Sequence, residues 1–213
     1  MKFLSENYYH LYNRGNDGQR IFLEAENYRF FLGRFREYLT KANAQFVAWC
    51  LMPNHYHAVV YLGGDSDFSN VLRAFMTSYV KSFNKWHGRF GHLFQGNTKA
   101  KLVDQDEYLI HLCRYIHLNP VRAGLVDLPE LWKYSDYREW VSETTSSGSR
   151  IAKVRGTHFG SGGEYQAFVM DYDAEERKRT EIEGGCLARP SKKSVFSLRL
   201  ASVRKRTSVK DRS

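Results

Sequence analysis

Hydrophobic and polar residues recur with clear periods through the first 140 positions. Short runs rich in aromatic and β-branched residues predict strands, since successive side chains of a strand point to opposite faces. Longer segments with apolar residues every three or four positions predict helices. In chain order the pattern predicts a strand at 8–12, a helix at 24–41, strands at 45–51 and 55–62, a helix at 67–86, a strand at 98–103 and a helix from residue 104.

Proline and glycine mark where these elements end. Pro53 cannot donate to a strand ladder, so residues 52–54 predict a turn that joins two strands into a hairpin. Pro120 is expected to end the last helix and to leave Asn119 in its final turn. The order β-α-β-β-α-β followed by a helix predicts an α+β fold: a ferredoxin-like core with an added C-terminal helix.

The composition changes after residue 140. Residues 142–163 are rich in Ser, Gly and Thr and predict a linker, and 164–183 can hold one charged helix. The Ser-, Lys- and Arg-rich end has too few apolar residues to build a core. We therefore expect a domain over 1–140, a linker with a short helical extension over 141–185, and a basic, disordered tail over 186–213.

The chain is basic, with 32 Lys and Arg against 23 Asp and Glu and a formal net charge of +9. Such a charge suits a polyanionic partner. Nine of the basic residues and only one acidic residue lie after residue 185, so the rest of the chain is nearly neutral. We expect the tail to add non-specific affinity and the body to determine which partner is bound.

Composition also indicates a compartment. Hydrophobic residues make up 42% of the chain, but no apolar run approaches the ~18 residues that a membrane span needs. The N-terminus has no apolar signal segment, and Cys50, Cys113 and Cys186 are too widely spaced for a thiolate metal site or a disulfide framework. We expect a reduced, soluble protein of the cytoplasm, associated with the nucleoid and without a membrane partner.

Two histidines fall on one face of the third predicted strand. His55 and His57 are separated by one residue, so both side chains project to the same side of the sheet. Two imidazoles in this arrangement can bind a divalent metal together. Two unrelated surface or core histidines would give the same pattern.

Tyr115 and Asn119 lie four residues apart in the last predicted helix and therefore share one of its faces. A phenol can attack phosphorus as a nucleophile, and an amide oxygen can be a third, hard metal ligand. The same spacing is also typical of a stripe of packing residues.

A basic stretch without acidic residues runs from Phe68 to Val103. Aromatic residues lie among its cations, and cations for phosphates with rings for stacking are what single-stranded nucleic acid requires. A solvated helix face is the ordinary alternative. The basic residues are Arg73, Lys81, Lys85, Arg89, Lys99 and Lys101.

Together these residues resemble the REP-associated tyrosine transposases, relatives of the single-tyrosine HUH insertion-sequence transposases. The resemblance covers about residues 7–140, and the tail has no part in it. Asn97 and Thr98 depart from the basic-aromatic pair that the family has before the fourth strand. The resemblance rests on YNRGN at 12–16, WCLMPNHYH at 49–57, LFQG at 93–96, YIHLNPVRAGLV at 115–126 and WKYSDY at 132–137.

The resemblance implies a mechanism. His55, His57 and Asn119 would bind Mg²⁺ or Mn²⁺, which polarises the scissile phosphate of single-stranded DNA. Tyr115, on the added helix, would attack phosphorus and form a 5′-phosphotyrosine, leaving a 3′-hydroxyl that can reverse the step. The DNA would be a hairpin-forming palindromic repeat.

Two alternatives remain open at this point: a non-catalytic single-stranded nucleic-acid-binding module on the same fold, and a metal-dependent phosphodiesterase that uses water. The sequence leaves open whether the protein is a monomer or a homodimer, and whether Tyr115 serves its own His pair or a partner's. The expected DNA contacts are Arg14, Arg73, Lys81, Lys85, Arg89, Phe94, Gln95, Lys99, Lys101 and Arg122.

Overall fold

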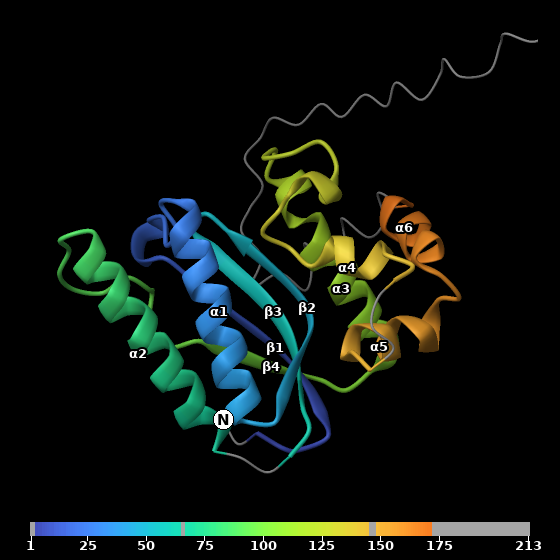
Figure 1. The fold of residues 1–213 in the computed structure, drawn as a ribbon, viewed down its shortest axis with the longest axis horizontal. Helices are drawn as coiled ribbons and strands as arrows, with labels where there is room; N and C mark the ends of the chain where they lie inside the picture. The colour runs from blue at the N-terminus through green and yellow to red at the C-terminus, as the bar shows by residue number, and fades with distance from the viewer. Residues whose placement is uncertain (1–2, 65–66, 145–147, 172–213) are drawn as a thin grey trace, which may run out of the picture.

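A computed structural model describes residues 3–64, 67–144 and 148–171 (Figure 1). The predicted order of strands and helices is confirmed, and the predicted tail lies outside the described residues. The elements are β1 (Asn7–Arg14), α1 (Ala25–Lys41), β2 (Ala44–Met52), β3 (His55–Leu62), α2 (Phe68–Trp86), β4 (Lys99–Val103), α3 (Asp106–Arg122), α4 (Tyr137–Val141), α5 (Arg150–His158) and α6 (Gly162–Met170), with short 3₁₀ turns at Asn16–Gly18 and Pro129–Leu131.

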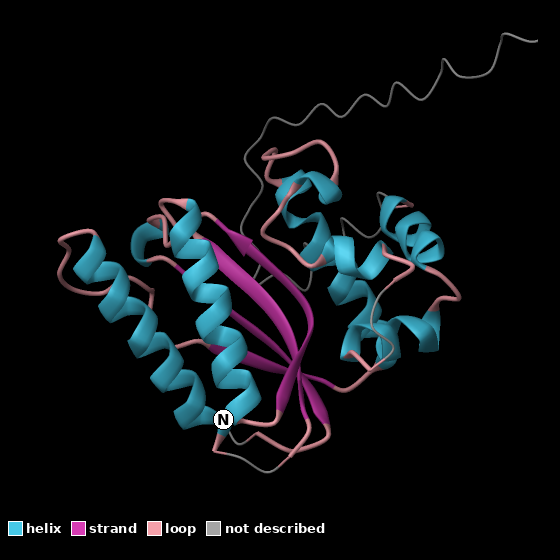
Figure 2. Ribbon diagram, in the orientation of Figure 1, coloured by secondary structure: helices cyan, strands magenta, loops and turns pink. Residues whose placement is uncertain are grey.

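The four strands form one antiparallel sheet in the order β2-β3-β1-β4. This is the ferredoxin-like order, in which the first and third strands lie side by side at the centre. Helices α1 and α2 cover one face of the sheet, and α3 to α6 lie on the other (Figures 1 and 2). The sheet is therefore a middle layer with a separate core on each side.

Aromatic residues fill the core between the sheet and α1 and α2. Phe35 of α1 stacks on Phe75 of α2 with ring centroids 4.4 Å apart, and Phe31 meets Tyr79 of α2 edge-on and Tyr56 of β3 at a tilt. These residues come from the apolar stripes that predicted the two helices. Their burial, with rings in offset and edge contacts, is the main force holding this layer together.

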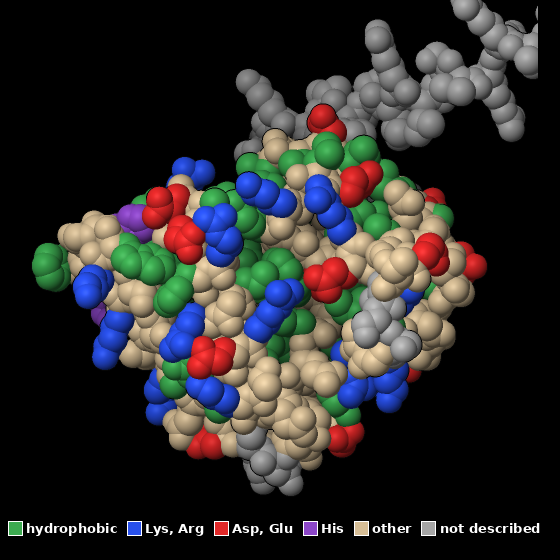
Figure 3. Space-filling view, in the orientation of Figure 1, with side chains coloured by type: hydrophobic (Ala, Val, Ile, Leu, Met, Phe, Trp, Pro, Cys, Tyr) green, Lys and Arg blue, Asp and Glu red, His purple; other side chains and the backbone are tan. Residues whose placement is uncertain are grey.

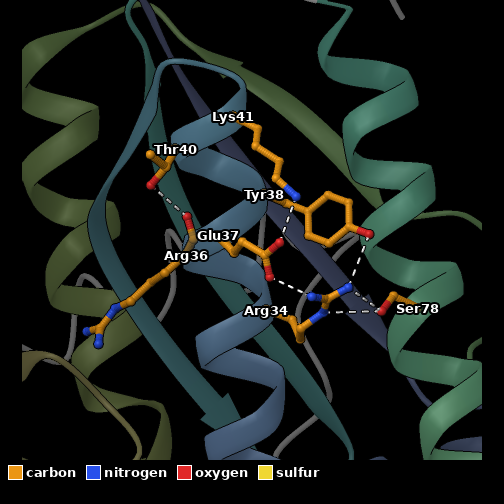
Figure 4. A network of polar contacts seen from close by, with 7 residues as sticks. All are labelled: Arg34, Arg36, Glu37, Tyr38, Thr40, Lys41 and Ser78. Carbon is orange, nitrogen blue, oxygen red and sulfur yellow. Dashed lines mark hydrogen bonds and ion pairs between the residues drawn. The ribbon is translucent and has the colours of Figure 1, made fainter.

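A polar network joins α1 to α2 above that core (Figure 4). Glu37 accepts from Arg34 at 2.5 Å and from Lys41 at 2.6 Å, one helical turn away on either side. Arg34 also donates to Ser78 of α2 at 3.1 Å. Because these groups are solvent-exposed, their attraction is screened, and the apolar contacts beneath contribute most of the stability.

The second core lies between the sheet and α3. Cys50 of β2 and Val59 of β3 point to this face and are buried with Cys113 and Ile116 of α3. Helix α3 lies mainly across β2. The polar side chains that β1 and β4 present on the same face are therefore less covered, which leaves room for a site beside α3.

A side chain caps the start of α2 but not that of α3. Asp67 caps α2, and its side chain accepts from the Asn70 amide at 3.2 Å. Helix α3 begins at Asp106, two residues after the predicted start at residue 104, and Gln105 occupies its N-cap position without a side-chain hydrogen bond.

The expectation that Pro120 ends the last helix is wrong, since α3 continues through it to Arg122. A proline so close to the C-terminus removes only one backbone hydrogen bond. The chain leaves the helical conformation at Gly124, two residues after the helix ends, with a φ of 66° that few other residues adopt easily. The Gly124 amide bonds the Val121 carbonyl and the Leu125 amide bonds the Pro120 carbonyl, both at 3.0 Å, which is a Schellman motif.

The predicted linker is also wrong in part, because residues 150–158 form helix α5. Ile151 and Val154 of α5 are buried in the same core as α3, and so are Tyr165 and Val169 of α6. Ser149 caps α5 by accepting from the Ala152 amide. The Ser- and Gly-rich composition hid a short apolar stripe, which forms a helix because β2 and α3 offer it an apolar surface.

A buried polar network fixes this layer. His117 of α3 bonds the Tyr165 hydroxyl at 2.7 Å and the Asp136 carboxylate at 2.9 Å. Asp136 also accepts from the Trp49 amide of β2 at 2.8 Å. One histidine thus connects α3 to α6 and to the edge of the sheet.

The described residues contain no helix that is long and apolar enough to cross a membrane. Cys50 and Cys113 are free and buried, and burial raises the pKa of both thiols well above the usual range. Neither is therefore a reactive thiol at neutral pH.

The buried network predicts that α6 contributes strongly to stability. Tyr165→Ala should lower the free energy of unfolding in urea by about 3–5 kcal/mol, because it leaves a cavity beside Trp140. Tyr165→Phe should cost about 1–3 kcal/mol, because it leaves the buried His117 Nδ1 without its hydrogen-bond partner. Met170→Ala on the same helix is the control: its side chain is 51% exposed, and it should cost less than about 0.5 kcal/mol. Equal losses for Tyr165→Ala and Met170→Ala would contradict the assignment.

Candidate active site

The two predicted metal ligands lie at the beginning of β3, on the face of the sheet that carries α3. The register places His57 opposite Tyr12 of β1 and Cys50 of β2, and His55 opposite Arg14. Residues directly opposite in an antiparallel pair point to the same face. The expectation that both histidines share one face is confirmed.

Helix α3 brings the other two predicted residues to this pair. The Tyr115 ring meets the His57 ring edge-on, with centroids 5.6 Å apart. Asn119 lies one turn further along the helix, close enough to His55 to act on the pKa of its imidazole. The fold therefore gathers all four residues within one chain, although about sixty residues separate the two pairs in the sequence.

Each potential ligand is held by a hydrogen bond at one end. An imidazole that is fixed at one ring nitrogen presents the other in a defined direction. An amide fixed through its nitrogen likewise presents its oxygen. The bonds join His55 Nδ1 to Asn54 Oδ1 at 2.7 Å, His57 Nδ1 to His10 Nε2 at 3.0 Å, and Asn119 Nδ2 to the Tyr115 carbonyl at 3.1 Å.

Burial keeps these imidazoles neutral. It lowers the pKa of His55 to about 4, against a hydrogen bond with Asn119 that acts in the opposite direction. Burial, with His10 and His55 nearby, lowers the pKa of His57 well below its ordinary value. Burial and the Lys101 cation lower the pKa of His10 to about 3. A neutral imidazole has a free lone pair, which metal binding requires.

The donor set fits a divalent cation that takes further oxygen ligands. Nowhere in the described residues do three His, Cys, Asp or Glu side chains come together as a metal group, so a site of protein carboxylates and thiolates is not formed there. Two neutral imidazoles and one amide oxygen suit Mn²⁺, and they suit Mg²⁺ when phosphate oxygens complete its shell. His55, His57 and Asn119 are the residues that would hold the ion.

Cations and aromatic rings surround these residues. The lysines of β4 pair with β1 and so point to the same face as the histidines. Arg14 is exposed at the end of β1, where its side chain donates to Gln95. The cation–ring pairs are Lys99 with Tyr12 at 5.9 Å, Lys101 with Tyr108 at 4.7 Å and Arg122 with Tyr115 at 5.0 Å.

Other predicted DNA contacts lie elsewhere. Arg73, Lys81 and Lys85 are exposed on α2, in the helical layer on the opposite side of the sheet. Over α1, Lys and Arg lie among Asp and Glu (Figure 3), whereas α2 itself carries no acidic residue. Arg89 is engaged with the segment between β1 and α1, where it donates to Gln19 at 2.7 Å.

Phe94 is not available for stacking on a base. It is only 6% exposed and contacts Tyr56 and Tyr79 in the aromatic core, so its predicted DNA contact is wrong. The exposed ring of this loop is Phe90, at 95%. Two flanking glycines at 88 and 91, both with positive φ, are the sequence feature that marks it as a loop tip.

A comparison with models of protein families gives a match that contains the residues of this site. A family model described as "Transposase IS200 like" matches residues 4–119, more than half of the chain, and the match ends on Asn119. The chain belongs to the IS200-like transposase family. All three predicted metal ligands and Tyr115 lie within the matched residues of this transposase-family protein.

Two curated relatives are REP-associated tyrosine transposases. The Escherichia coli (strain K12) protein is 30% identical over 120 residues, which cover 49% of this chain and 68% of that protein. A Haemophilus influenzae protein, named a putative REP-associated tyrosine transposase, is 26% identical over 101 residues, covering 43% of this chain and 57% of its own. The resemblance found in the sequence is thereby confirmed.

A solved structure shares the fold. It is a REP-associated tyrosine transposase bound to a REP hairpin, and it superimposes with a TM-score of 0.56 at 19% identity. The match covers 68% of this chain and 86% of that one. At this identity the similarity establishes the fold of the IS200-like domain.

The lowered pKa values predict a pH dependence of stability. Between pH 6.5 and about 4 an unfolded chain protonates these histidines while the folded chain does not, so stability should fall as pH falls through this window. Each such histidine contributes at most about 1.4 kcal/mol per pH unit. Urea unfolding of metal-free protein at several pH values should give a shallower dependence for His57→Gln than for the parent. Identical slopes would contradict the burial of these imidazoles as neutral groups.

Proposed function

We propose that this protein is a metal-assisted tyrosine transposase that cleaves and rejoins single-stranded DNA at hairpin-forming palindromic repeats. The observation that carries the proposal is the placement of Tyr115 beside His57, with Asn119 reaching His55 from the same helix. The names of the two curated relatives and the hairpin held by the solved homologue support the choice of substrate.

In this mechanism the Tyr115 hydroxyl oxygen attacks the scissile phosphorus. A bond forms between phosphorus and Tyr115, the bond from phosphorus to the 3′ oxygen breaks, and the phenolic proton passes to solvent. The 3′ oxygen takes up a proton and leaves as a hydroxyl, while the 5′ end stays attached to Tyr115. His55, His57 and Asn119 are the residues that would hold a divalent ion, which would supply Lewis-acid stabilisation of the phosphate oxygens.

Arg122 assists the nucleophile. It lies two turns after Tyr115 on α3, and its guanidinium sits over the Tyr115 ring at 5.0 Å. A cation there favours a phenol that loses its proton and attracts the phosphate that the phenol attacks. It stays charged throughout the reaction, so it stabilises both the approach and the covalent product.

The strand path follows β1 and β4 beside α3. Lys99 and Lys101 supply cations for phosphates, and Tyr12 and Tyr108 supply rings in the same patch. Cations interleaved with rings bind single strands with little sequence preference. The choice of hairpin therefore falls to other surfaces, of which the loop that carries Phe90 is our candidate.

The first experiment detects the covalent intermediate. The protein is incubated with end-labelled single-stranded hairpin DNA and Mn²⁺ or Mg²⁺, and denaturing gels resolve any protein–DNA adduct. The parent should form an adduct and Tyr115→Phe should form none, because only the hydroxyl is removed. His57→Ala should lower adduct formation by about 10²-fold or more. Tyr38→Phe, on α1 on the other side of the sheet, is the control and should retain the adduct.

The alternatives predict different gels. Cleavage without an adduct would support a phosphodiesterase that uses water, and binding without cleavage would support a non-catalytic module. Adduct formation that persists in EDTA would contradict the metal assistance but not the attack by Tyr115. Either of the first two results would overturn the tyrosine mechanism.

A second experiment tests the DNA path by matched charge removal. Lys99→Ala with Lys101→Ala should weaken binding of single-stranded DNA and reduce the slope of log affinity against log salt by about 1.4, close to 0.7 for each lost phosphate contact. Lys81→Ala with Lys85→Ala removes the same charge from α2, on the other side of the sheet, and should leave the slope nearly unchanged. Equal losses from both double variants would contradict the path along β4.

A further inference from the structure

His10 lies directly behind the pair of predicted ligands. It stands on β1 opposite Lys101 and is only 5% exposed. Its Nε2 is 3.0 Å from His57 Nδ1, and the two rings stack with centroids 5.2 Å apart at 24°. This buried histidine belongs to no motif that identified the site.

The His10–His57 bond has two arrangements with opposite consequences. If His57 Nδ1 carries the proton and donates it, His57 Nε2 has a free lone pair that can bind a metal. If His10 Nε2 carries the proton instead, His10 donates the hydrogen bond and His57 Nδ1 accepts it. The neutral His57 ring then carries its own proton on Nε2. In that second arrangement His57 has no nitrogen to offer a metal.

The neighbouring histidine shows how the site selects one arrangement. His55 Nδ1 is bonded to Asn54 Oδ1, an oxygen that can only accept, so His55 carries its proton on Nδ1. Its Nε2 is then the nitrogen with the lone pair. For both imidazoles to serve one ion, His57 must adopt the same proton position.

We propose that His10 is a positioning residue that accepts the Nδ1 proton of His57 and so holds His57 Nε2 ready to bind a divalent metal. The inference rests on the proposed metal site and adds a residue to it. A bound ion draws electron density from the His57 ring and strengthens its Nδ1–H as a donor, so the bond to His10 and the bond to the metal reinforce each other.

A pair of substitutions separates this role from simple packing. His10→Phe keeps a flat ring in the stack and removes the acceptor. His10→Gln gives up the ring and keeps an acceptor, because Gln Oε1 can reach the place of the imidazole Nε2. Packing alone would favour the Phe variant, and the proposed role favours the Gln variant.

Mn²⁺ affinity without DNA is the first readout, measured by the loss of the free-ion electron paramagnetic resonance signal. His10→Phe should weaken binding about 10- to 100-fold, the usual effect of removing such a partner. His10→Gln should stay within about three-fold of the parent. Equal affinity for the parent and His10→Phe, or a greater loss for Gln than for Phe, would overturn the proposal.

The proton position in the parent protein is the second readout, and it needs neither a variant nor a metal. Long-range ¹H–¹⁵N spectra of ring-labelled, metal-free protein should show the His57 proton on Nδ1. A proton on Nε2 would overturn the role of His10. A parent that binds no Mn²⁺ at all would instead refute the proposed metal assistance, so the two failures can be told apart.

Discussion

The register between β1 and β3 is the constraint on which the site depends. Their antiparallel pairing puts His10, Tyr12 and His57 on the face that carries α3. A slip of one residue would move every side chain of one strand to the other face. Tyr56, which lies between the two histidines, would then lose its place in the aromatic core beside Phe31. The core on one face thus holds the polar residues of the other in position.

Helix α3 supplies the second half of the site, and its own placement comes from the opposite side of the helix. His117, between Tyr115 and Asn119 in sequence, points away from the pair and bonds Asp136 and Tyr165. These buried bonds fix how far the helix lies along the sheet and how it is rotated. The helices after residue 140 therefore do more than extend the chain, because one of them helps to orient the helix that carries Tyr115.

The sequence patterns predicted the structure correctly wherever the spacing of apolar residues matches the face that is buried. The aromatic stripes of α1 and α2 and the alternation in β3 predicted both the elements and the face that holds the His pair. Helix α5 was missed because Ser, Gly and Thr dominate the sequence around it. Its few apolar residues, Ile151 and Val154, are too few to predict a helix until the surface on which they are buried is known. Pro120 misled for a related reason: local preference disfavours a helix there, but packing of α3 outweighs one lost bond.

Only the fold shows which residues of the basic stretch lie near the site and which lie elsewhere. Lys99 and Lys81 have the same local composition, yet the sheet lies between them. Phe94 and Phe90 are four residues apart in one loop, and one is core while the other is almost fully exposed. His10 belongs to a strand far from the His pair, so its role depends on a pairing register that no local motif reports.

The central claim is that β3 and α3 together present one tyrosine to a phosphate held beside two neutral histidines. The most direct measurement is peptide mapping by mass spectrometry of the parent protein after reaction with hairpin DNA and nuclease trimming. The account predicts a single modified peptide that carries a 5′-linked nucleotide on Tyr115. A nucleotide on Tyr108, Tyr12 or another tyrosine, or cleaved DNA with no modified peptide, would contradict it.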